Sequence, residues 1–162
     1  MTARGLKFFH YCFLGCIMLA LLQRVTKATV QSNGETLGSI DRGLLIFLGF
    51  EKDDKKESVL KLVSKILKFR IFSDAEDKMN LSVRDINGSI LVVSQFTLAA
   101  NTKDGNRPSF DTALKPVLAK EYYEFFLEEL NKSGLHIEQG QFGADMQVSL
   151  MNDGPVTFIL KY

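Results

Sequence analysis

The chain has 162 residues, of which 46% are hydrophobic and 24% charged, and no repeat of fixed period is visible, as expected for one globular domain. Residues 18–162 hold 18 of the 20 bases against all 19 acids, and this near-neutral body excludes the basic excess typical of nonspecific nucleic-acid binding. Both cysteines and one of the two histidines precede residue 18, which excludes a disulfide framework, a thiolate metal site and a histidine-rich metal site from the body.

Arg4 and Lys7 precede a run from Phe8 to Leu22 that is apolar apart from His10, as in a secretory signal. The run is short for a bilayer, no clear cleavage site follows it, and it continues into Gln23-Arg24-Val25, which we interpret as a core strand. Met18 is an alternative start. We expect residues 1–17 to be an extension or a start-site artefact, residues 18–162 to form a single domain, and the protein to be cytoplasmic. Export or membrane attachment through residues 1–17 is the alternative.

The first part of the body predicts three strands. Leu19 to Val30 is rich in aliphatic and β-branched residues, and Ser32-Asn33-Gly34-Glu35 is a hairpin signal because the central positions of that turn need positive φ. A return strand over Thr36 to Ile40 follows. The continuous apolar run Leu44 to Leu48 predicts a strand that is buried on both faces. We expect these three segments to form an antiparallel unit.

The next part predicts a helix and a second hairpin. Asp53-Asp54 is an N-cap signal, and apolar residues then recur at three- and four-residue spacing, which predicts one buried stripe. The stripe consists of Val59, Leu62, Val63, Ile66 and Leu67. We interpret the lysine-rich opposite face as a solvated surface. Asn87-Gly88 predicts a hairpin that leads into a strand over Ser89 to Leu98.

The remainder predicts an exposed loop over Ala99 to Arg107, a second helix that begins at Pro116 and stops at Ser133-Gly134, and two alternating strands joined at Asn152-Asp153-Gly154-Pro155. The buried stripe of this helix is expected to be Leu118, Tyr122, Phe126 and Leu130. Strands interrupted by two principal helices predict an α+β fold with a mainly antiparallel, barrel-like sheet.

Two segments are candidates for chemistry. Ser94-Gln95-Phe96-Thr97-Leu98 places two hydroxyls and an amide at the end of an apolar strand, although a strand that alternates into solvent explains it equally. Asn152 to Thr157 is rich in turn residues, and Gly154-Pro155 is an X-Pro bond, the one kind that is cis with any frequency. A glycine before a cis bond can point two carbonyl oxygens the same way, and such a pair can bind an ammonium group.

Conventional hydrolase chemistry finds little support in the body. His136 is its only histidine, and its place just beyond a helix favours a surface or half-buried structural role over that of a base. The acids form no HxxE or DxD cluster, so we expect neither a metal nor a cofactor. A hydrolase with this sequence takes its base from elsewhere.

Seven ordered segments, taken together, resemble the D-aminoacyl-tRNA deacylase family from about Met18 to the C-terminus. They are Leu22-Gln23-Arg24-Val25, Gly43-Leu44-Leu45, Arg70-Ile71-Phe72, Lys78-Met79-Asn80-Leu81, Ser94-Gln95-Phe96-Thr97-Leu98, Arg107-Pro108-Ser109-Phe110, and Phe142 to Val148 leading to Asn152-Asp153-Gly154-Pro155-Val156-Thr157. The resemblance implies hydrolysis of the ester between a D-amino acid and the terminal adenosine of tRNA, by a homodimer with two active sites at its interface.

The resemblance also assigns site residues. It implies that Ser94, Gln95, Phe96 and Thr97 line the catalytic pocket, with Phe142 and Met146 close by. It implies further that a cis Gly154-Pro155 projects from one subunit into the pocket of the other, and that Arg24 braces this loop. Lys103 and Arg107 are guesses for tRNA contacts from loop placement alone.

The implied mechanism needs no protein base. The 2′-hydroxyl of the tRNA lies beside the ester, and backbone N–H groups near Phe96 and Thr97 can stabilise the oxyanion. Thr97 as a nucleophile is the alternative. An L-amino acid would drive its Cβ into the loop, whereas glycine, including glycine mischarged on tRNA-Ala, would pass. A noncatalytic RNA-binding dimer of the same fold is the competing function.

Overall fold

The structure is a computed structural model that describes residues 18–162, so the predicted extension over residues 1–17 lies outside the described residues. The strands are β1 (Leu19–Ser32), β2 (Glu35–Ile40), β3 (Gly43–Gly49), β4 (Phe72–Ser73), β5 (Met79–Leu81), β6 (Ser89–Ser94), β7 (Ile137–Gln139) and β8 (Gln147–Lys161). The helices are α1 (Lys56–Lys68), the short 3-10 helix η1 (Phe96–Ala99) and α2 (Pro116–Asn131). None of the helices within residues 18–162 is long and apolar enough to cross a membrane.

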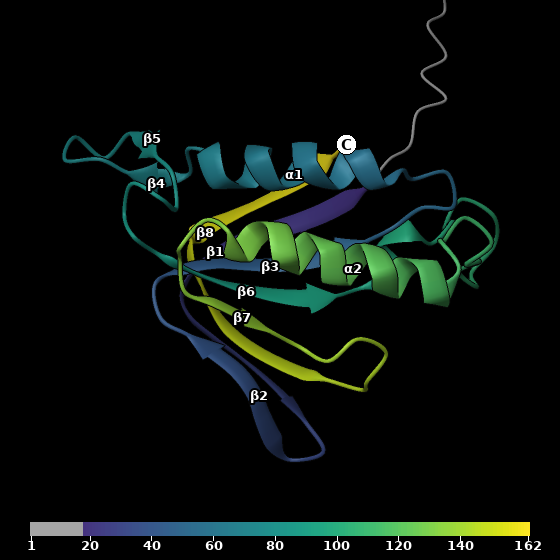
Figure 1. Cartoon of the computed structure of the whole chain (residues 1–162). Helices are drawn as coiled ribbons and strands as arrows, with labels where there is room; N and C mark the ends of the chain where they lie inside the picture. The colour runs from purple at the N-terminus through teal and green to yellow at the C-terminus, as the bar shows by residue number, and fades with distance from the viewer. Residues whose placement is uncertain (1–17) are drawn as a thin grey trace, which may run out of the picture.

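A six-stranded sheet in the order β2-β1-β3-β6-β7, with β8 also paired to β1, forms the centre of the structure. The pairings of β1 with β2, β3 and β8 are antiparallel, whereas β3–β6 and β6–β7 are parallel. Both helices lie on one side of this sheet (Figure 1). The sheet curls so that β2 contacts β6 and β7. The predicted α+β class with two principal helices is confirmed, and the sheet is mixed.

The hairpin predicted at Asn87-Gly88 is wrong. Asn87 does have the positive φ of a turn residue, 48°, but β6 then pairs in parallel with β3, Ile90 opposite Leu44. A parallel partner requires a crossover connection, and α1 lies in that connection. The predicted strand also ends early, at Ser94, because Phe96 to Ala99 turn into η1.

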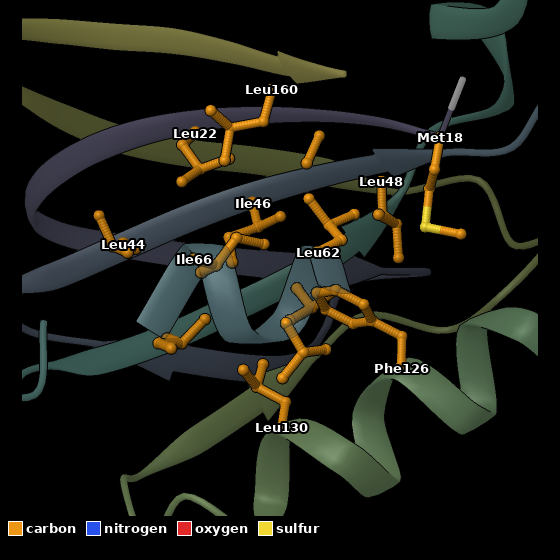
Figure 2. Packing of buried hydrophobic residues seen from close by; sticks show 14 of the residues in the cluster. Met18, Leu22, Leu44, Ile46, Leu48, Leu62, Ile66, Phe126, Leu130 and Leu160 are labelled. Carbon is orange, nitrogen blue, oxygen red and sulfur yellow. The ribbon is translucent and has the colours of Figure 1, made fainter. Parts of the chain in front are cut away.

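The core lies between the sheet and the two helices. Leu62 and Ile66 of α1 and Phe126 and Leu130 of α2 are completely buried, and their side chains meet those of the central strands (Figure 2). Large buried side chains each stabilise a fold by about 1.5–3 kcal/mol relative to exposure. This packing fixes β3 and β6, and therefore the segment that follows Ser94.

Two details of the helices differ from the sequence prediction. Asp53-Asp54 does not cap α1: Lys55 is the N-cap, without a side-chain hydrogen bond. The carboxylate of Asp54 instead accepts the backbone N–H of Glu51 at 2.8 Å. In α2 the predicted stripe is buried apart from Leu118, which is 38% exposed in the first turn.

The predicted turn over residues 152–155 is also wrong, because β8 is one strand that pairs with β1 on both sides of it. Thr157 lies opposite Gln23 and Asn152 opposite Val25, so residues 153–156 stand opposite Arg24 alone. Extra residues in one strand form a bulge that bends away from the ladder. We call residues 153–156 the β8 bulge.

Candidate active site

The first candidate segment begins where β6 ends. The backbone N–H of Gln95 donates to the carbonyl of Leu48 at 2.7 Å and so continues the ladder with β3 for one residue. The chain then enters η1, in which the N–H of Leu98 donates to Gln95 and that of Ala100 to Thr97. The sheet therefore holds the start of this short helix in place.

Two backbone donors at the start of η1 are free. Within residues 18–162, no hydrogen bond uses the amide N–H of Phe96 or Thr97, as expected for the first turn of a helix. The Thr97 hydroxyl accepts a hydrogen bond of 2.5 Å from Nε2 of Gln95. Both free amides lie beside this side-chain pair, a local arrangement that can bind an oxyanion.

Phe96 forms part of an exposed aromatic pair. Its side chain is 61% exposed and that of Phe110 is 41% exposed, and the two ring centroids are 5.0 Å apart at an interplanar angle of 57°. Large aromatic side chains of this kind are normally buried. The pair therefore offers an apolar surface for a partner or a substrate beside the free amides.

The β8 bulge is held by side chains on both strands. Nε of Arg24 lies 3.0 Å from Oδ2 of Asp153, an ion pair rather than an aligned hydrogen bond. Oδ1 of Asn152 accepts the N–H of Val156 at 3.2 Å, and its Nδ2 donates to the hydroxyl of Thr157 at 2.8 Å. Asn152 thus closes the base of the bulge. Arg24 therefore contacts the bulge, and its role in bracing the loop stays a prediction.

The tip of the bulge is Gly154-Pro155, whose peptide bond is cis and whose residues are exposed. Gly154 has φ of +118°, and a Cβ there would lie 2.7 Å from Cγ2 of Val156 and 3.1 Å from Nη2 of Arg24. Both observations require glycine at this position. The tip is therefore exposed and closely braced at the same time.

Phe142 and Met146 lie on the connection between β7 and β8, at the same end of the sheet as Ser94. The N–H of Gly140 donates to the carbonyl of Val92 at 2.9 Å, which places the start of this connection two residues from Ser94. In Figure 1 the connection and the arrowhead of β6 lie on the same side of the molecule. The structure thus brings these two predicted residues to the end of the sheet that carries η1.

Tyr123, which the sequence analysis does not mention, supports this connection. Its hydroxyl is within 3.0 Å of the carbonyl of Val92 and 3.3 Å of the carbonyl of Gly140, and its ring centroid lies 5.7 Å from that of Phe142. Burial raises the pKa of this phenol well above its ordinary value. It therefore stays a neutral donor that ties the connection to β6.

A single chain does not bring the two candidate segments together. Arg24, which faces the β8 bulge, is in register with Leu44, and Leu44 with Ile90, four residues before Ser94. Strands β8 and β6 are three strand spacings apart. At about 3.3 Å per residue and about 4.8 Å per strand, the bulge lies roughly 20 Å from Ser94.

Within residues 18–162, the only side chain that is hydrogen-bonded to the Thr97 hydroxyl is the amide of Gln95, which is neither an acid nor a base. The carbonyl of His136 accepts the N–H of Ile90, so this histidine lies at the opposite end of β6, roughly 13 Å from Ser94. Its imidazole is 60% exposed and pairs with Glu138 at 3.1 Å. Within residues 18–162 no cluster of histidine, cysteine or acidic side chains could hold a metal ion.

The sequence analysis did not single out Asn152, Thr157, Phe110 or Tyr123 as members of the site. The first three stand inside the segments quoted for the family resemblance, and that is the signal that could have found them. Tyr123 carries no such signal, since its spacing on α2 is that of an ordinary buried residue.

The fold defines an α+β protein with a mixed sheet, and comparisons with known proteins identify its family. The family model described as D-Tyr-tRNA(Tyr) deacylase matches residues 21–161. A D-aminoacyl-tRNA deacylase of Haemophilus influenzae (strain PittEE) is 56% identical over 144 residues, which cover 89% of this chain and 99% of that protein. The chain belongs to the D-Tyr-tRNA(Tyr) deacylase family.

Two solved structures are similar to the chain. One titled c-Myc DNA Unwinding Element Binding Protein is 42% identical, with a TM-score of 0.83 over 88% of this chain and 97% of that one. Another, titled as a probable eukaryotic D-amino acid tRNA deacylase, has a TM-score of 0.82 over 90% of this chain and 100% of that one at 16% identity. The second likeness shows the fold alone.

Proposed function

We propose that this protein hydrolyses the ester of D-aminoacyl-tRNA and releases the D-amino acid and free tRNA. The observation that carries the proposal is the pair of free amides of Phe96 and Thr97, in a chain whose relatives bear the name of this activity. Incubation with matched D- and L-tyrosyl-tRNA tests it. The D-ester should be cleaved and the L-ester kept, whereas a noncatalytic RNA-binding dimer would leave both intact.

The free amides would stabilise the oxyanion of the tetrahedral intermediate. A variant that removes one donor is Phe96→Pro, and proline is tolerated at the first position of a helix. Loss of one such donor lowers kcat by about 10² to 10³. Phe96→Leu is the matched control, because it also removes the ring but keeps the N–H. Equal loss in both variants would assign the effect to the ring.

In place of a protein base, the 2′-hydroxyl of the terminal adenosine would assist the attacking water. This agrees with the position of His136 at the far end of β6 and with Thr97 having only an amide neighbour. A D-aminoacyl-tRNA that ends in 2′-deoxyadenosine tests the step. It should bind but resist hydrolysis, and rapid hydrolysis would contradict substrate assistance.

The active site would be completed across a homodimer, with the β8 bulge of one subunit in the pocket of the other. The separation of roughly 20 Å within one chain supports this arrangement, as does the apolar surface of β8. Its exposed large apolar side chains are Leu150, Met151, Phe158 and Ile159. Large apolar side chains left exposed on a strand can contribute to an interaction surface. Light scattering coupled to size exclusion should give a dimer mass.

Mixed dimers test whether the two segments act in trans. A subunit with Gly154→Val and a subunit with Phe96→Pro should each be inactive as homodimers. Their heterodimer contains one intact pocket facing one intact bulge, so about half of the wild-type activity per dimer should return. No recovery in a purified heterodimer would show that both segments act within one chain.

The bulge would also select the hand of the amino acid. The ammonium group of a D-substrate would bind the carbonyls of Gly154 and Pro155, and an L-side chain would collide with the tip, which Arg24 and Asn152 hold. Gly154→Ala should therefore reduce turnover or admit L-esters, because its Cβ meets Val156 at 2.7 Å. Glycyl-tRNA, including glycyl-tRNA-Ala, should be cleaved. Unchanged turnover together with unchanged selectivity in a folded Gly154→Ala protein would exclude this role.

This reaction would take place with the tRNA pool in the cytoplasm. The alternative is export or membrane attachment through residues 1–17, which lie outside the described part of the chain. Fractionation of cells that express the full reading frame tests it. A processed product outside the cytosol would contradict the proposal.

A further inference from the structure

The outer face of α1 carries an open hollow in which three of the six lining residues are lysines. Its volume is about 580 Å³, and its lining residues are Leu60, Lys61, Ser64, Lys65, Lys68 and Tyr162. The four polar helix positions follow the three- and four-residue spacing of one helix face. We call Lys61, Ser64, Lys65 and Lys68 the lysine face. Lys61, Ser64 and Lys68 are exposed and Lys65 is half-buried, so this face lies apart from the buried stripe of α1.

The lysine face lacks compensating acids. Among residues 18–162, no ion pair includes Lys61, Lys65 or Lys68, and no acid lines the hollow. Some lysines elsewhere are paired with glutamates, for example Lys120 with Glu124 and Lys132 with Glu129. On the lysine face, three lysines without such a partner share one side of a single helix. In a nearly neutral body, they give this side of α1 a locally positive charge.

The lysine face continues directly into the element that supports the β8 bulge. After Lys68 the ring of Phe69 packs against that of Phe158, with centroids 5.2 Å apart. Two residues later the carbonyl of Ile71 accepts Nη1 of Arg24 at 2.8 Å, and Arg24 pairs with Asp153 of the bulge. A ligand whose end lies at the bulge can therefore continue over α1 of the same subunit.

We propose that the lysine face binds the phosphate backbone of the acceptor end of tRNA. This proposal rests on the proposed function, in which the aminoacyl end lies at the β8 bulge. Lysine and serine contacts to phosphate position a nucleic acid but carry no sequence information. Residues 1–17 contain two bases and no acid, so they do not complement this charge.

The salt dependence of tRNA binding tests the lysine face. The ligand is tRNA that carries no amino acid. Its binding is measured by fluorescence anisotropy between 50 and 200 mM salt, for the wild-type full chain and for the triple variant Lys61→Gln, Lys65→Gln, Lys68→Gln. The binding constant falls with salt, and each lost phosphate contact makes the slope of log K against log salt less steep by about 0.7 to 0.9. The wild type should therefore lose about 20- to 40-fold more affinity over this range than the variant.

A control variant that loses the same number of charges on and beside α2 distinguishes a local binding site from an effect of net charge. The triple variant Lys115→Gln, Lys120→Gln, Lys132→Gln should keep the wild-type slope, and arginine at all three lysine-face positions should restore it. Equal losses in the two glutamine variants would overturn the proposal. So would a lysine-face variant that keeps tRNA binding and loses only its binding to vesicles of anionic phospholipid.

Hydrolysis of two substrates separates this proposal from the proposed function. The lysine-face variant should show at least a tenfold higher KM for D-tyrosyl-tRNA, with kcat for D-tyrosyl-adenosine, which has no stem, unchanged. If the wild type hydrolyses neither ester, the proposed function fails. If it hydrolyses both and the KM of the variant for the tRNA is unchanged, the lysine-face proposal alone fails.

Discussion

Asp54 should make the stability of the protein decrease as the pH rises through the neutral range. The residue is 6% exposed, and its Oδ1 has no hydrogen-bond partner within residues 18–162. Burial is the main cause that raises the pKa of its carboxyl from 3.8 to about 7, and the charges of Glu51 and Asp53 add to it. The N–H of Glu51 acts in the opposite direction, because it stabilises the charged form.

The direction follows from proton linkage. Between pH 3.8 and 7 the folded protein holds a proton on Asp54 that the unfolded chain has released, so the free energy of unfolding falls as the pH rises. The slope approaches 1.4 kcal/mol per pH unit, and the decrease between pH 4.5 and 7.5 is about 3 kcal/mol. The stabilisation is complete below pH 4 and lost above pH 7.

Asp54→Asn isolates this contribution, because asparagine stays neutral and keeps an acceptor for Glu51. Urea unfolding of both proteins at pH 4.5, 6.0 and 7.5, at one fixed protein concentration, gives the difference in unfolding free energy at each pH. That difference should shift by about 3 kcal/mol in favour of the variant as the pH rises. Parallel pH profiles would refute the reasoning, whatever the absolute stability of the variant.

Three further changes test the site and the core. Tyr123→Phe frees the connection that carries Phe142, so it should raise KM for D-tyrosyl-tRNA more than it lowers kcat and should destabilise the fold by about 1–3 kcal/mol. An unchanged KM would show that Tyr123 contributes to packing alone. Thr97→Ala should keep appreciable deacylase activity, and near-total loss in a folded variant would favour a nucleophilic threonine. Phe126→Ala should lower the free energy of unfolding by about 3–5 kcal/mol, against less than about 0.5 for the exposed Val117→Ala, both measured in urea.

Local sequence patterns predicted most elements, because the stripes of α1 and α2 and the alternation of the strands depend on neighbours along the chain. They did not reveal how the strands pair. Asn87-Gly88 has the residues of a hairpin, but α1 intervenes between β3 and β6, and a strand-helix-strand order favours parallel pairing. That order was present in the sequence and outweighs the turn signal.

The β8 bulge shows the same limit. The residues of a bulge and of a tight turn are alike, and only the length of β1, which spans both halves of β8, distinguishes them. At the site, the segments that carry the family resemblance include Arg24 and Gly154-Pro155. The structure places the side chain of Arg24 beside the β8 bulge. Tyr123 escaped prediction because its hydroxyl bonds to carbonyls distant in sequence.

The interruption of β8 has a consequence for solubility. Within residues 18–162 this strand of 15 residues pairs only with β1, and a long straight free edge is a template on which other chains can add strands and aggregate. The detour at residues 153–156 divides that edge into two shorter and differently directed pieces. Straightening β8 by deleting these residues would therefore be expected to yield a protein prone to form fibres.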